Sequence, residues 1–162
     1  ISCGLTSEAG SFGLALIGLF NMIGSLLAGW LGGRLPHRYI LSGIYGLRAV
    51  AIIIFMAFPV TEWSLYLFTS VFGLLWLSTV PGTNSIVAIL FGPKFVGMLF
   101  GIVFFSHQLG AFMGAWMAGL LYESYGSYDV VWWISIALGV AAALVHLPIK
   151  EQLSSQLQPA TA

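Results

Sequence analysis

The sequence predicts an all-α, polytopic bundle of transmembrane helices, and three observations lead to this fold class. The chain has 162 residues, of which 59% are hydrophobic and 6% charged, whereas a soluble domain carries about 25% charged residues. Five apolar segments are each long enough to cross a bilayer, which takes about 20 helical residues. These segments are apolar on all faces and about twice as long as the 9–11-residue strands of membrane barrels.

The predicted spans are residues 11–32, 40–58, 64–91, 98–121 and 130–148, separated by short polar or Gly/Pro-rich connections. One such segment alone is equally consistent with a buried helix or core strand of a soluble protein. Five in succession, with no amphipathic helix between them, favour a membrane protein. We therefore expect a transmembrane bundle over residues 1–148 and a disordered polar tail over residues 149–162.

Composition also excludes several classes of function. The formal net charge is zero, so we expect no nucleic-acid partner. The single cysteine, Cys3, rules out an internal disulfide and a cysteine-based metal cluster. The sequence contains no His-Glu-x-x-His helix, no Gly-x-Ser-x-Gly turn and no phosphate loop. We expect no enzyme activity, no cofactor and no metal; the lipid bilayer is the expected partner.

The charges between the spans predict the orientation. Basic residues lie in the first and third connections and in the tail, whereas acidic residues lie in the leading segment and in the second and fourth connections: Arg34, Arg38, Lys94 and Lys150, against Glu8, Glu62, Glu123 and Asp129. Cytoplasmic loops are rich in Lys and Arg. We therefore expect an inner (plasma) membrane protein with its N-terminal edge outside and its tail in the cytoplasm. No signal peptide precedes the first span, and because residue 1 is Ile we expect the natural N-terminus to lie upstream.

The 20 glycines predict where helices approach one another, because small residues permit close packing in lipid. Glycine pairs spaced by four residues and a stripe of small residues on the first span are the candidate seams: Gly29/Gly33, Gly97/Gly101, Gly110/Gly114, and Gly18, Asn21, Ser25 and Gly29. The alternative for any one pair is chance spacing in a glycine-rich chain.

Polar and helix-breaking residues inside the spans are the candidate functional residues. Pro81-Gly82-Thr83-Asn84 is expected to interrupt the third span, which places a break near a substrate path or forms a purely structural kink. Arg48 lies about 15 Å into the second span. It either binds an anion or acts in coupling, or else it reaches the interface or pairs with backbone carbonyls.

The fourth span carries His107 and Gln108 near its middle. Histidine can exchange a proton near neutral pH, so His107 is either a coupling or substrate residue or a hydrogen-bonding group at a helix seam. Asn21 and Asn84 either contact substrate or join helices, and Trp76 either stacks on substrate or fills the bundle.

The sequence resembles the C-terminal half of the major facilitator superfamily. Residues 29–38, Gly-Trp-Leu-Gly-Gly-Arg-Leu-Pro-His-Arg, are similar to the Gly-x-Leu-Ala-Asp-Arg-x-Gly-Arg loop of that family, with Gly33 in the place of the Asp. Residues 76–83, 105–110 and 126–129 resemble bacterial relatives of the monocarboxylate transporters. In the animal monocarboxylate transporters a charged Asp–Arg pair stands where this chain has Asn21 and Ser25, so proton-linked monocarboxylate transport cannot be carried over.

The resemblance implies that the five spans are helices 8–12 of a twelve-helix fold, with the N-terminal half of the protein missing. It implies a secondary transporter that moves a small polar or organic-anion solute by alternating access, with protons as a candidate coupling ion. It also implies that Asn21, Trp76, Asn84, His107 and Gln108 face the cavity and that the span of Arg48 is peripheral. The alternative is a non-transporting membrane sensor or receptor built on a transporter fold.

Overall fold

The structure, a computed structural model, is a bundle of long helices, and it describes residues 5–151. Its elements are α1 (Ser7–Gly32), α2 (His37–Ala57), α3 (Glu62–Trp76), α4 (Thr79–Phe91), the 3₁₀ turn η1 (Pro93–Phe95), α5 (Val96–Tyr125) and α6 (Asp129–His146). In this part of the chain five helical spans are long and apolar enough to cross a membrane, with α3 and α4 together forming the third. The predicted all-α fold is confirmed. Cys3 and residues 152–162 of the tail predicted over residues 149–162 lie outside the described residues.

Local sequence signals begin and end the helices. The Thr6 hydroxyl caps α1 by accepting a hydrogen bond from the backbone N–H of Ala9 at 3.1 Å. Thr61 and Ser64 form a reciprocal capping box at the start of α3, which satisfies backbone N–H groups that a helix start leaves unpaired. Gly126 ends α5 with a φ of 68°, a left-handed conformation that glycine adopts without steric cost.

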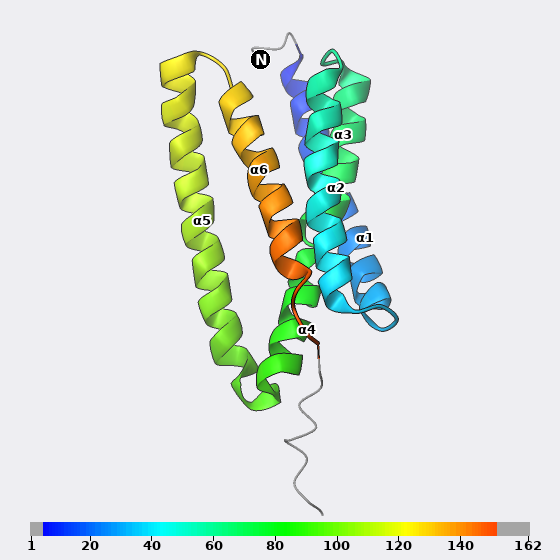
Figure 1. The fold of residues 1–162 in the computed structure, drawn as a ribbon. Coiled ribbons are helices and arrows are strands. Elements are labelled where there is room, and N and C mark those ends of the chain that lie inside the picture. Colours follow the sequence, from blue (N-terminus) through cyan, green and yellow to red (C-terminus); the bar gives the residue numbers. More distant parts are fainter. Residues whose placement is uncertain (1–4, 152–162) are drawn as a thin grey trace, which may run out of the picture.

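The helices alternate in direction, so the connections sort to two ends of the bundle (Figure 1). The α1–α2 loop, the α4–α5 connection and the end of α6 lie at one end, while the start of α1 and the α2–α3 and α5–α6 connections lie at the other. The predicted basic connections therefore share one end of the bundle. The predicted acidic segments share the opposite end.

The two most extensive helix interfaces join α1 to α3 and α2 to α6. In the first, α1 lies so close to α3 that a Cβ atom added to Gly24 would be 1.8 Å from the carbonyl oxygen of Leu74, and one added to Gly73 would be 2.8 Å from the Cα of Ile17. In the second, α2 packs against α6 through a buried cluster of Ala49, Ile52 and Ile136. Both interfaces use small residues to bring helices together, as packing in lipid requires.

The glycine pairs predicted as seams do not lie in these two interfaces. Among the described residues, no heavy atom lies within 4 Å of a Cβ built at Gly97, Gly101, Gly110 or Gly114 on α5, nor at Gly18 or Gly29 on α1. The close face of α1 instead carries Gly13, Gly24 and Ala28, which is one helical position away from the predicted stripe. Because one residue turns a helix by about 100°, spacing alone identified the kind of seam but not its face.

The break in the third span also differs from its prediction. Pro81, Gly82, Thr83 and Asn84 are all helical and belong to α4, and the interruption lies at Leu77 and Ser78, between α3 and α4. Proline lacks an N–H and its ring clashes with the carbonyl four residues earlier, which here is the carbonyl of Leu77. The disruption therefore falls one turn before the proline.

Candidate functional site at the break in the third span

The break between α3 and α4 leaves backbone groups without their usual helical partners. Pro81 cannot donate to the carbonyl of Leu77, which accepts instead from the N–H of Val80 at 3.1 Å, a tighter three-residue turn. Such freed groups are costly at membrane depth unless protein or a water-filled cavity satisfies them. In this chain, side chains from two other spans do so.

Arg48 of α2 binds the end of α3. Its Nη2 donates to the carbonyl oxygens of Leu75 at 2.6 Å and Trp76 at 2.5 Å. A cation at the C-terminal end of a helix also opposes the partial negative charge of the helix dipole. The guanidinium lies over the rings of Tyr45 and Trp76, at 5.2 and 5.8 Å from their centroids. The pairing with backbone carbonyls that was predicted for Arg48 is therefore present in the structure.

Asn21 of α1 binds the first residue of the break. Its Oδ1 accepts a hydrogen bond from the backbone N–H of Leu77 at 3.2 Å. Leu77 follows the last residue of α3. Different helices thus satisfy this segment: Arg48 of α2 donates to its carbonyls, with the Thr79 hydroxyl also donating to that of Trp76 at 3.3 Å, and Asn21 of α1 accepts from its N–H.

The depth of Arg48 makes this arrangement energetically significant. Arg48 lies about 16 Å along α2 from His37, at about 1.5 Å per residue, which is close to the middle of a hydrocarbon core about 30 Å thick. A charge there costs about 2.5–3.5 kcal/mol on insertion scales. The two carbonyls and two aromatic faces offset part of that cost. The Nε of Arg48 is buried and has no hydrogen-bond partner within residues 5–151.

The structure brings together three of the six predicted site residues and leaves three apart. Arg48, Asn21 and Trp76 meet at the break. The side chains of Asn84 on α4 and of His107 and Gln108 on α5 are exposed, and in the described chain no hydrogen bond joins them to the break. The ring of His107 lies 6.2 Å from that of Phe104 on its own helix.

A cavity of about 630 Å³ lies at the opposite end of the molecule from the α1–α2 loop. It is lined by the start of α1, the end of α2 and the α5–α6 connection, including Thr6, Phe55, Tyr122 and Trp132. None of the six predicted site residues lines it. No cluster of three metal-binding side chains occurs among residues 5–151.

Sequence analysis did not identify two residues, Tyr45 and Glu151, that support the helix carrying Arg48. Tyr45 lies one turn before Arg48 and stacks on His146 of α6 with ring centroids 5.2 Å apart; an aromatic residue in an apolar span gives no signal of its own. Glu151 binds the start of α2. A signal for Glu151 was present, since it is an acidic residue on the predicted basic side of the bundle.

Taken together, the five apolar spans and the break held at membrane depth define a multi-pass membrane protein. The family model of the Major Facilitator Superfamily matches residues 2–162. The uncharacterized MFS-type transporter YcxA of Bacillus subtilis (strain 168) is 26% identical over 145 residues, which are 86% of this chain and 36% of that protein. No solved structure matches. The chain belongs to the Major Facilitator Superfamily, as its resemblance predicted, and it spans 36% of the length of this relative.

Proposed function

We propose that this chain is part of a secondary active transporter that moves a small solute across the membrane by alternating access, and that the α3–α4 break is one of its moving joints. One observation supports the proposal: the helical backbone is interrupted between α3 and α4, and side chains of α1 and α2 hydrogen-bond to the end of α3 and to Leu77 at this interruption. Hydrogen bonds from side chains can exchange partners when helices tilt. A continuous helix would have to break its own ladder to bend at the same place.

The chemistry at the break favours a polar or anionic solute. Arg48 brings a permanent positive charge to mid-membrane. Its two nearest acceptors are neutral carbonyls, so the charge itself is not neutralised by an acidic partner. A carboxylate that reached Arg48 would gain a charge-assisted bond. Asn21 would supply an orienting hydrogen bond and Trp76 an aromatic surface.

We assign binding or coupling to the exposed polar residues of α5 and α4. His107 is the proposed proton or substrate residue, and Gln108 and Asn84 are proposed to orient the solute. Their support is that these side chains, unlike Arg48 and Asn21, make no hydrogen bond with the rest of the described chain. They remain free to bind groups outside it.

We further propose that the protein lies in the inner membrane with the end that carries the α1–α2 loop and the end of α6 in the cytoplasm. The support is the sorting of basic and acidic connections to opposite ends. Labelling of single cysteines introduced at Lys94 and Glu123 with a membrane-impermeant maleimide, in a Cys3→Ser background of intact cells, tests this. Only the position 123 variant is expected to react; the reverse pattern would overturn the orientation.

Replacement of Pro81 with Ala in the full-length protein tests the moving joint. Alanine restores the N–H that can bond to the carbonyl of Leu77, so the third span should become a continuous helix. We expect uptake of labelled organic acids, such as lactate, succinate and glutamate, into proteoliposomes under an imposed proton gradient to fall at least tenfold, with the amount of folded protein unchanged. Pro59→Ala, in the α2–α3 connection, is the matched control.

Two results would decide against the proposal. Uptake by Pro81→Ala equal to that of wild type would show that the break is not a joint of transport. Absence of flux for every solute tested, with the wild-type protein folded, would favour a membrane sensor or receptor on the same fold.

A further inference from the structure

The N-terminus of α2 lacks a cap of its own. Its N-cap position is Pro36, and no side chain near it in sequence forms a capping hydrogen bond. The first backbone N–H groups of a helix have no partner within the helix and carry partial positive charge. These groups here receive a partner from the other end of the chain.

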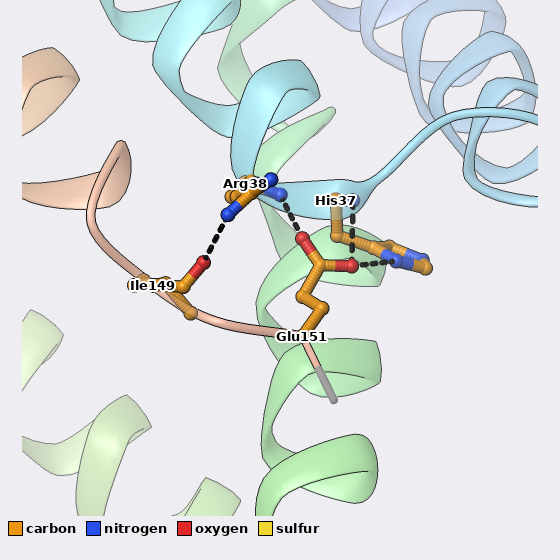
Figure 2. Close-up of polar contacts among 4 residues, drawn as sticks. All are labelled: His37, Arg38, Ile149 and Glu151. Atoms are coloured by element: carbon orange, nitrogen blue, oxygen red, sulfur yellow. Dashed lines mark hydrogen bonds and ion pairs between the residues drawn. The ribbon is translucent and has the colours of Figure 1, made fainter. Parts of the chain in front are cut away.

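Glu151 supplies that partner (Figure 2). Its Oε2 accepts from the backbone N–H of His37 at 2.9 Å, and its Oε1 accepts from the backbone N–H of Arg38 at 2.5 Å. The Nδ1 of His37 lies 3.3 Å from Oε2. In the opposite direction, Nη1 of Arg38 donates to the carbonyl oxygen of Ile149 at 3.0 Å. One carboxylate therefore caps two successive N–H groups, and the segment after α6 is fastened to α2 from both sides.

The helix that precedes the fastened segment, α6, packs against the turn of α2 that carries Arg48. His146, near the end of α6, stacks on Tyr45 with ring centroids 5.2 Å apart. Tyr45 in turn lies under the guanidinium of Arg48. Gly139 of α6 backs the same turn, since a Cβ atom there would lie 3.4 Å from both the Cβ of Ala49 and the carbonyl oxygen of Tyr45.

We propose that Glu151 is a positioning residue: by capping α2 and fastening α6 to it, Glu151 holds Tyr45 and Arg48 in register with the break between α3 and α4. The contacts form a continuous path from Glu151 through the end of α6 to Tyr45, then to Arg48 and the carbonyls of Leu75 and Trp76. This inference rests on the break described for the proposed function, but it concerns the support of the break and not the flux through the protein.

Amide hydrogen exchange of the full-length protein in lipid nanodiscs tests the path. Glu151→Gln keeps the shape of the side chain but removes its charge and one of its two acceptor oxygens. We expect exchange in the peptide covering residues 36–40 to rise roughly fivefold, and exchange in the peptide covering residues 74–80 to rise about two- to threefold. Lys150→Ala, which removes an exposed neighbouring charge, is the matched control and should leave both peptides as in wild type.

Each of the other outcomes would refute a stated part of the proposal. Faster exchange at 36–40 with unchanged exchange at 74–80 would leave Glu151 a local cap and refute the positioning role. Unchanged exchange at both would refute the cap itself.

Tyr45→Leu keeps the test decisive even if Glu151→Gln does not fold. It interrupts the path at its midpoint, so residues 74–80 should exchange faster while residues 36–40 stay protected. Unchanged exchange at 74–80 in this variant would also refute the path. Because exchange is measured without a solute, a failed uptake experiment with Pro81→Ala leaves this result standing, and the reverse also holds.

Discussion

Two parts of the described chain, the packed helices and the edge helix α5, use their polar residues in opposite ways. In the packed body of α1, α2, α3 and α6, the polar side chains Arg48 and Asn21 make their hydrogen bonds to the backbone of neighbouring helices. In α5, no residue is buried. The side chains of His107 and Gln108 make no hydrogen bond to any other residue among 5–151. Figure 1 shows α5 at one edge of the molecule, near α6 at one end and α4 at the other.

This comparison separates support from binding. Arg48 and Asn21 already bond to the backbone at the break and so support the structure, and they can offer a solute only the hydrogen-bonding capacity and charge that these bonds leave. An unsatisfied polar group in a membrane span is by default a functional candidate. We therefore propose that the packed body chiefly supports the break, where Arg48 adds its positive charge, and that α5 makes the main contact with solute or protons.

The largest effect is expected where two backbones touch. Gly24→Val should push α1 away from the carbonyl of Leu74 and destabilise the protein by about 3 kcal/mol or more. On α5, Gly110→Ala meets no neighbour among residues 5–151 and should stabilise the helix by up to about 1 kcal/mol. Thermal unfolding in detergent measures both. Equal losses at the two positions would remove the distinction between the packed body and α5.

The next effect concerns Arg48. Arg48→Met should leave the carbonyls of Leu75 and Trp76 without a strong donor and cost about 2 kcal/mol of stability, the usual range for a buried group left unsatisfied. Arg48→Lys should recover part of this loss, because an ammonium can reach one carbonyl at a time. A melting temperature of Arg48→Met at or above that of wild type would contradict the role of Arg48 in supporting the break.

A smaller effect concerns the charge of Glu151. Burial disfavours its charged form, but the hydrogen bonds from the backbone N–H groups of Arg38 and His37 and from the His37 ring outweigh burial and hold the pKa of Glu151 below its ordinary value. A carboxyl with a lowered pKa in the folded state stabilises the protein above its unfolded pKa and loses that contribution as pH falls through the folded value.

The cap should therefore contribute about 1 kcal/mol throughout pH 5–8 and lose it only below about pH 4.3, the ordinary pKa of Glu. The difference in stability between wild type and Glu151→Gln, measured across pH, gives the result. A difference that already vanishes between pH 7 and pH 5 would show that the carboxyl is not held in its charged form.

The sequence alone was sufficient for the fold class because the five apolar segments are long and successive. It was less informative about rotation and register. Gly24 and Gly73 were not distinguished from the other glycines, since a one-residue rotation of a uniformly apolar helix changes no local pattern. The break was predicted at Pro81 itself, whereas the effect of proline falls on the carbonyl one turn earlier. Glu151 and Tyr45 act through contacts with segments far away in sequence, which no local pattern encodes.

His107 tests the division between support and binding most directly. It lies on the helix without buried residues, so His107→Ala should leave the free energy of unfolding within about 0.5 kcal/mol of wild type, as for an exposed substitution. The decisive measurement is uptake per folded full-length protein in proteoliposomes, followed across external pH. We predict that His107→Ala abolishes uptake or removes its dependence on the proton gradient. Wild-type uptake with an unchanged pH dependence would contradict the account.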